Sequence, residues 1–133
     1  MKPNYIFLLI EDNTIDQIIT SKLLKSIDGV KDVNVVNNGK EGIQWLDNYH
    51  GSNNDCLIIL TDIKMPEMDG FAFLAAYEKL DAELQGRTQV YILSSTLNAD
   101  EITRGNNNRH VKKMMSKPLP FKEFSEMIKP NAC

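Results

Sequence analysis

Five short apolar segments recur along the chain, separated by longer stretches in which apolar and polar residues alternate. They lie at residues 5–10, 33–36, 56–60, 90–93 and 111–115. Three of them are nearly continuous in Val, Ile and Leu, which is typical of strands buried on both faces of a parallel sheet. The last segment alternates only weakly and therefore indicates an edge strand.

The stretches between these segments carry helical patterns. In the first, a set of apolar side chains falls on one face at the spacing of a helix, so we expect this face to be buried: Ile15, Ile18, Ile19, Leu23 and Ile27. Thr14 and Gln17 offer a capping box at its start. Further helices are expected over residues 39–50 and 70–80, from Asn98 with Glu101 as a capping box, and from Pro120 onward.

This regular alternation of strands and helices predicts the fold class. Right-handed crossovers between parallel strands give an α/β, doubly wound, three-layer sandwich of the flavodoxin-like kind. We expect a five-stranded parallel sheet in the order 2-1-3-4-5. The chain has 133 residues and shows no linker, repeat or low-complexity block, so we expect residues 1–133 to form a single domain.

Composition and charge argue against several classes of protein, namely nucleic-acid-binding, membrane and disulfide-rich secreted proteins. The net charge is −3 and the basic residues are scattered, which argues against nucleic acid or an anionic membrane as the main partner. No signal peptide or spanning segment is visible. Cys56 and Cys133 are too few for a disulfide framework, and we expect both to be free thiols. The prediction is a cytoplasmic globular protein.

Polar side chains with candidate chemistry follow four of the five apolar segments within two residues. Glu11 and Asp12 follow the first, Asp62 follows the third, Ser94 the fourth and Lys117 the fifth. In open α/β sheets ligands bind outside the carboxyl ends of the strands, where the winding reverses. The three carboxylates are therefore expected to converge there, although Glu11 and Asp12 could instead only cap the first helix, and Ser94 could be an ordinary loop hydroxyl.

Converging carboxylates repel one another unless cations are close. Mg²⁺ is a hard cation that one or two carboxylates commonly hold, and Lys117 supplies a positive side chain. This set suits phosphoryl transfer to a carboxylate: Asp62 would attack phosphorus, while Lys117 and Ser94 would bind the transferred group. An aspartate at this point in the chain is unfavourable for stability, and a phosphorylation site would explain it.

Four short motifs, "LLIEDN", "LTDIKMPEMDG", "YILSS" and "KPL", resemble the receiver domain of two-component response regulators in order and spacing. The resemblance covers essentially all of the chain. It implies an aspartyl phosphate formed with Mg²⁺ from the phosphohistidine of a sensor histidine kinase or a histidine phosphotransfer protein. It implies a signalling protein rather than an enzyme, with at most self-catalysed phosphotransfer and autodephosphorylation. We expect such a stand-alone receiver to signal through contacts with an unknown effector protein.

The resemblance also implies a role for individual residues. Asp62 would be the phosphoacceptor, and Ser94 and Lys117 would bind the phosphoryl group as switch residues. The expected metal ligands are Asp12, Asp62, the backbone carbonyl of Lys64 and, through water, Glu11. The residues that would shape the adjoining turns are Pro66, Gly70 and Pro118, the last with a cis bond to Lys117.

Ser94 replaces the threonine and Glu11 the aspartate that are more usual in the family, and a third departure, at Met114, leaves the output open. Met114 stands where the family usually has an aromatic residue, so it is a possible switch partner that could repack instead. The alternative function is therefore a pseudo-receiver that works as a constitutive docking module without phosphorylation. A flavodoxin-like cofactor protein is disfavoured because the acidic residues after the first strand would repel a phosphate. A phosphatase needs a second carboxylate where Lys64 stands.

Overall fold

Five strands form one parallel sheet in the computed structural model, which describes residues 4–52, 54–95 and 97–129. The strands are β1 (Asn4–Ile10), β2 (Val30–Val36), β3 (Asp55–Thr61), β4 (Thr88–Ser94) and β5 (Val111–Ser116). Their order in the sheet is β2-β1-β3-β4-β5, and every neighbouring pair is parallel. The predicted order and fold class are confirmed, including the position of β5 at an edge.

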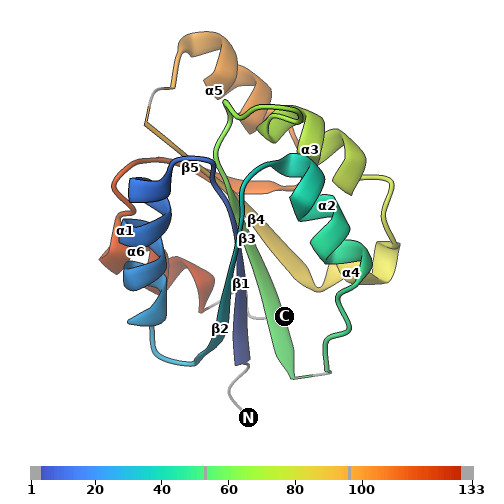
Figure 1. The fold of residues 1–133 in the computed structure, drawn as a ribbon, viewed down its shortest axis with the longest axis vertical. Coiled ribbons are helices and arrows are strands. Elements are labelled where there is room, and N and C mark those ends of the chain that lie inside the picture. The colour runs from blue at the N-terminus through green and yellow to red at the C-terminus, as the bar shows by residue number, and fades with distance from the viewer. Residues whose placement is uncertain (1–3, 53, 96, 130–133) are drawn as a thin grey trace.

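Helices cover both faces of this sheet (Figure 1). They are α1 (Thr14–Lys25), α2 (Gly39–Asp47), α3 (Gly70–Tyr77), α4 (Ala82–Gly86), α5 (Ala99–Asn106) and α6 (Phe121–Ile128). The helices α1 and α6 lie on one face, and α2, α3 and α4 lie on the other (Figure 1). The three layers of the predicted sandwich are therefore present.

The apolar segments are continuous because successive strand residues enter two different cores. In β1, Tyr5, Phe7 and Leu9 belong to the core beneath α1 and α6, whereas the even-numbered residues belong to the core beneath α2 and α3. Side chains of a strand point alternately to its two faces, so a strand covered on both sides needs apolar residues throughout. This burial fixes the register and, with it, the edge at which each strand ends.

The predicted inward face of α1 is wrong for three of its residues. Ile15, Ile18 and Ile19 are exposed by 67%, 54% and 46%, whereas Thr20 and Leu24 are buried. The stripe that packs on the sheet passes through Thr20 and Leu24 and continues to Ile27, which follows the helix. Both stripes satisfy the spacing of a helix, so the pattern alone could not show which of them faces the sheet.

The helix ends differ from the prediction in three places. The second predicted helix ends at Asp47 and not at residue 50. The cap of α1 is Asn13, whose side-chain oxygen accepts from the Asp16 N–H at 3.0 Å, so the capping box expected at Thr14 and Gln17 is wrong. The third predicted helix ends at Tyr77, and the short helix α4 follows it. The capping box of Asn98 and Glu101 is confirmed.

Cys56 corrects a further expectation. It lies at the start of β3 and is disulfide-bonded, so the predicted free thiol is wrong for this residue, and the prediction for Cys133 lies outside the described residues. The end of α6 returns to this part of the sheet, because Gln89 Nε2 lies 3.7 Å from Cys56 Sγ and 3.4 Å from the carbonyl of Ile128. Such proximity between distant segments is not visible in the cysteine spacing.

Within the described residues, no helix has both the length and the apolar character that a membrane crossing requires.

Candidate functional site

The polar residues predicted to meet do lie together at the carboxyl edge of the sheet. Glu11 and Asp12 follow β1, Asp62 follows β3, Ser94 ends β4 and Lys117 follows β5. They line one open cavity of about 430 Å³. Lys64 and Asp16 line the same cavity. Parallel strands carry all their carboxyl ends to one edge, and this explains how residues more than a hundred positions apart, Glu11 and Lys117, reach one pocket.

Asp62 is held by contacts to both its backbone and its side chain. Its N–H donates to the carbonyl of Ile10 at 3.0 Å, which continues the pairing of β1 with β3. Its Oδ1 accepts from the Ile63 N–H at 2.7 Å, and its Oδ2 accepts from Lys117 Nζ at 2.8 Å. The side chain is 11% exposed. The carboxylate is thus fixed in orientation while one side of it remains open to the cavity.

Three carboxylates form an acidic cluster that fits a divalent cation. One oxygen from each of Glu11, Asp12 and Asp62 lies within 4.8 Å of the others. Glu11 is buried and Asp12 is exposed, so the cluster has a protected side and an open side. Mg²⁺ prefers oxygen ligands, few carboxylates and several waters, and this donor set meets those requirements. The residues present could therefore hold Mg²⁺.

Burial disfavours the charged form of Glu11 in this cluster. It raises the pKa of Glu11 above its usual value of 4.5, and the nearby charge of Asp62 acts in the same direction. The Lys117 ammonium and the Asn13 N–H, which donates to Glu11 Oε2 at 3.1 Å, partly offset the effect of burial on this pKa. A buried carboxylate under such opposing influences is typical of a site kept for function rather than for stability.

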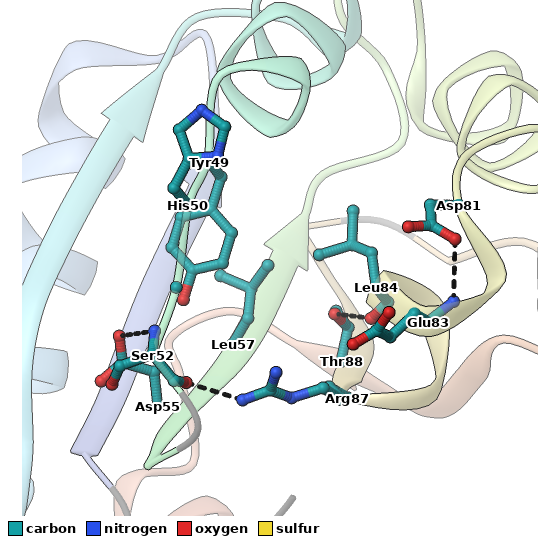
Figure 2. Close-up of a pocket in the computed structure, with 11 residues that line it drawn as sticks. Tyr49, His50, Ser52, Asp55, Leu57, Asp81, Glu83, Leu84, Arg87 and Thr88 are labelled. Carbon is teal, nitrogen blue, oxygen red and sulfur yellow. Dashed lines mark hydrogen bonds between the residues drawn. The ribbon is translucent and has the colours of Figure 1, made fainter.

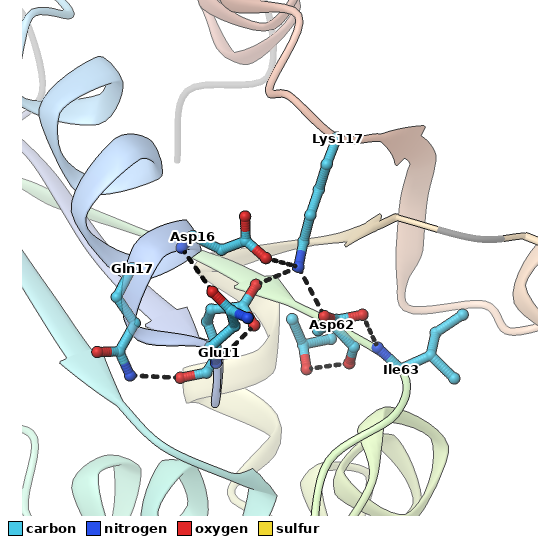
Figure 3. A network of polar contacts seen from close by, with 8 residues as sticks. Glu11, Asp16, Gln17, Asp62, Ile63 and Lys117 are labelled. Carbon is cyan, nitrogen blue, oxygen red and sulfur yellow. Dashed lines mark hydrogen bonds and ion pairs between the residues drawn. The ribbon is translucent and has the colours of Figure 1, made fainter.

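Lys117 binds three carboxylates at once (Figure 3). Its Nζ lies 2.5 Å from Glu11 Oε1, 2.8 Å from Asp62 Oδ2 and 2.9 Å from Asp16 Oδ2. Burial alone would lower the pKa of this lysine, but the hydrogen bonds that it donates to the three carboxylates outweigh burial and raise the pKa. The side chain is therefore a permanent cation in the pocket.

The loops around the pocket have a constrained geometry. The Lys117 N–H donates to the Ser94 carbonyl at 2.9 Å and joins the ends of β4 and β5. The bond from Lys117 to Pro118 is cis, as expected. Gly70 leaves no room for a side chain, since a Cβ there would lie 2.3 Å from the Asp62 carbonyl oxygen. Pro66 lies in the same loop, where its carbonyl accepts from the Met68 N–H at 2.7 Å.

Met114 lies on β5, away from the residues that line the acidic cavity. Its side chain packs towards α5, where Gly105 has only a hydrogen: a Cβ at Gly105 would lie 2.1 Å from Met114 Sδ. A role for Met114 as a switch partner stays a prediction.

Three residues that contact the site were not predicted. They are Asn13, which donates to Glu11; Gln17, whose Nε2 donates to the Glu11 carbonyl at 2.6 Å; and Asp16, which binds Lys117. Asp16 lies four residues before the buried Thr20, so it is on the face of α1 that turns inward. The four-residue spacing between Asp16 and Thr20 could have placed Asp16 on the inward face, but the isoleucine pattern predicted that a different face of α1 is buried.

A second cavity lies at the opposite, amino-terminal edge of the sheet, between the starts of β3 and β4 (Figure 2). Here Asp55 Oδ2 accepts from the Ser52 N–H at 3.1 Å, and Arg87 Nη2 donates to the Ser52 carbonyl at 2.6 Å. Burial would raise the pKa of Asp55, but these Ser52 bonds and Lys31 lower it. The polar contacts close the loop before β3, and none of the predicted site residues lies here.

Comparison with known proteins decides the family. The family model of the response regulator receiver domain matches residues 7–129. The chain belongs to this family. Receiver domains are signalling domains that interact with histidine kinases or histidine phosphotransfer proteins and that bind Mg²⁺ at an acidic pocket. In this receiver, Glu11, Asp12 and Asp62 form an acidic cluster that could hold a metal ion.

Solved structures of response regulators share its fold. The receiver protein of Dyadobacter fermentans is 25% identical, with a TM-score of 0.85 and coverage of 95% of this chain and 96% of that chain. The phosphorylated cyanobacterial phytochrome response regulator RcpA is 26% identical, with a TM-score of 0.70 and coverage of 97% and 91%. A two-component response regulator from Cytophaga hutchinsonii is 21% identical and has a TM-score of 0.85, with 97% of each chain covered, which shows the shared fold. The search of curated proteins found no match.

Proposed function

We propose that this receiver is a response regulator whose Asp62 accepts a phosphoryl group from the phosphohistidine of a sensor histidine kinase or a histidine phosphotransfer protein. One observation carries the proposal: the Asp62 carboxylate belongs to the acidic cluster and contacts the Lys117 ammonium, and it lines an open cavity. The solved structure of RcpA, which is 26% identical, is of a phosphorylated protein.

Asp62 has the orientation of a nucleophile. The Ile63 N–H holds Oδ1 and Lys117 holds Oδ2, so the carboxylate cannot rotate freely as a donor approaches. A carboxylate oxygen would attack phosphorus, the bond from phosphorus to the imidazole nitrogen would break, and the histidine would leave. The product is an aspartyl phosphate on Asp62. Fixing the nucleophile in advance lowers the entropy cost of this step.

Mg²⁺ would be held by Asp12, Asp62 and the Lys64 backbone carbonyl, with Glu11 acting through water. When bound, it neutralises negative charge on the phosphoryl oxygens. Among the residues of the chain, Lys117 and the Ser94 hydroxyl would bind the oxygens of the transferred group. Pro66, Gly70 and Pro118 would shape the loops that hold these side chains without contacting the phosphoryl group.

Protein partners are expected, and one candidate contact surface lies on α1. The exposed side chains of Ile15, Ile18 and Ile19 lie on α1, next to the pocket, where a donor protein must approach. Isolated exposed apolar residues are common, but three on one helix beside a reaction site favour a protein contact. We propose that output also occurs through contact with an effector protein and does not require nucleic acid or a membrane.

The remaining parts of the proposal concern extent and location. We propose that residues 1–133 act as a single receiver domain in the cytoplasm, where a kinase can draw on ATP. Cys56 is disulfide-bonded, so a free thiol at this residue cannot be used as an argument for the cytoplasm. We also propose that any chemistry is limited to self-catalysed phosphotransfer and autodephosphorylation.

The proposal is tested by incubating the purified protein with Mg²⁺ and acetyl phosphate and following its intact mass. We expect a gain of one phosphoryl group that depends on Mg²⁺ and is absent from Asp62→Asn. Wild-type protein that remains unmodified under these conditions, and that binds neither Mg²⁺ nor beryllofluoride, would contradict the proposal. A docking module that works without phosphorylation would then be the better explanation.

A further inference from the structure

Asp16 is the one carboxylate contacting Lys117 for which neither the motifs nor the acidic cluster provide a role. It lies in the first turn of α1, and its side chain points to Lys117 (Figure 3). Its Oδ2 is 2.9 Å from Lys117 Nζ. The Asn13 side chain accepts from the Asp16 N–H at 3.0 Å and so fixes the backbone from which the carboxylate projects.

The number of donors on Lys117 limits what it can bind. A lysine ammonium has three N–H donors and no acceptor. In this structure three carboxylates lie within hydrogen-bond distance of it, those of Glu11, Asp16 and Asp62. All three donors are therefore committed. If a phosphoryl oxygen is to receive a hydrogen bond from Lys117, one carboxylate must release its donor.

Exposure indicates which carboxylate does so. The side chain of Glu11 is 2% exposed, that of Asp62 is 11% exposed, and that of Asp16 is 33% exposed. A buried carboxylate that loses its cation is left without compensation, whereas an exposed one regains hydrogen bonds from water. Asp62 is in addition the group that carries the phosphoryl. Asp16 is thus the partner that Lys117 can leave at the lowest cost.

We propose that Asp16 is a positioning residue of the phosphorylation site. Its carboxylate holds the third N–H donor of Lys117 and releases it when a phosphoryl oxygen enters the pocket. This inference rests on the proposed function. Asp16 thereby keeps the ammonium in the pocket, and as a neighbouring negative charge it also competes with the phosphoryl group for the same donor.

The competition predicts that removing the carboxylate strengthens binding of a phosphoryl analogue. We would titrate beryllofluoride into the protein at saturating Mg²⁺ and measure the dissociation constant by calorimetry. Asp16→Asn should lower this constant about two- to fivefold, as expected for loss of a partly exposed ion pair. Asp16→Ala, which cannot accept a hydrogen bond, should lower it at least as much.

Two further variants separate this role from general effects. Asp16→Glu retains the competing charge and should behave nearly as the wild type. Asp47→Asn removes an exposed acid at the end of α2 and should leave the constant unchanged. A residue with a purely structural role would weaken binding when replaced, so tighter binding that Glu reverses is specific to competition.

Each result decides the matter. An unchanged or larger dissociation constant in both Asp16→Asn and Asp16→Ala would overturn the inference, as would an equal gain in Asp47→Asn. If Asp16→Asn does not fold, Asp16→Ala and Asp16→Glu give the same comparison. Failure of the wild-type protein to bind beryllofluoride would instead count against Asp62 as the phosphoacceptor, so the two failures are distinguishable.

Discussion

Lys117 is the residue on which the charge balance of the pocket depends. Its ammonium contacts three carboxylates, two of them largely buried, and their hydrogen bonds keep the pKa of the lysine raised despite its own burial. Removing it would leave Glu11 and Asp62 close together with no cation between them. Loss of one partner of a buried ion pair is far more costly than loss of a surface pair.

We predict that Lys117→Met lowers the free energy of unfolding by about 2 kcal/mol at neutral pH. The loss should shrink as pH falls. Burial raises the pKa of Glu11 above 4.5, so the folded protein holds the proton of Glu11 more tightly than the unfolded chain does. The stability that this proton provides is fully present below the unfolded pKa and is lost as pH rises through the folded pKa. Without Lys117 the Glu11 pKa rises further, and acidification then relieves more of the repulsion.

Urea unfolding at neutral pH and at about pH 5 measures this effect. Lys122→Met is the matched control, because Lys122 is an exposed lysine of α6. A difference between wild type and Lys117→Met that is the same at both pH values would show that the buried carboxylates do not cause the loss.

At the scale of elements, the connection from β3 to α3 positions Asp62 through a backbone contact. Gly70, the first residue of α3, donates its N–H to the Ile63 carbonyl at 2.7 Å, and a Cβ at this residue would lie 2.3 Å from the Asp62 carbonyl oxygen. Both neighbours are backbone atoms, which cannot move aside as a side chain can. The loop therefore holds its shape only with glycine at this position.

Gly70→Ala should lower the free energy of unfolding by about 1–3 kcal/mol and weaken binding of beryllofluoride, because the backbone of Asp62 must shift. Gly86→Ala is the control, since a Cβ at Gly86, the last residue of α4, would meet nothing within 4 Å. Unfolding curves of the two variants test this directly. Equal stabilities for Gly70→Ala and Gly86→Ala would contradict the close approach.

The orientation of α1 can be tested in the same way. Leu24 is fully buried, whereas Ile18 is 54% exposed. Leu24→Ala should cost about 2–5 kcal/mol, and Ile18→Ala less than about 0.5 kcal/mol. Comparable losses in the two variants, measured by urea unfolding, would mean that the isoleucine stripe faces the sheet after all.

At the scale of the whole molecule, the sheet and the residues at its carboxyl edge could be predicted from the sequence, because both depend on the pattern of apolar residues in the strands. Glu11, Asp62 and Lys117 directly follow strands and Ser94 ends one, and parallel pairing brings these residues to one edge. The strands β1, β3 and β4 are buried on both faces, so their apolar segments are nearly unbroken and their ends are visible in the sequence.

The features that were missed depend on how elements pack against one another. The inward face of α1 could not be chosen from spacing, since Ile15, Ile18 and Ile19 form as regular a stripe as the residues that are buried. Asp16 was missed for the same reason. The helix α4 has only five residues, too few for a periodic pattern.

A phosphoryl group on Asp62 is the central claim, and locating that group is the most direct test. The protein would be treated with Mg²⁺ and acetyl phosphate, reduced with borohydride to convert an aspartyl phosphate into homoserine, digested and analysed by mass spectrometry. We predict homoserine at residue 62 and at no other carboxylate. Homoserine at Asp12, or 2-amino-5-hydroxypentanoic acid at Glu11, instead of homoserine at residue 62 would contradict the claim, as would no reduced residue under conditions in which a known receiver is modified.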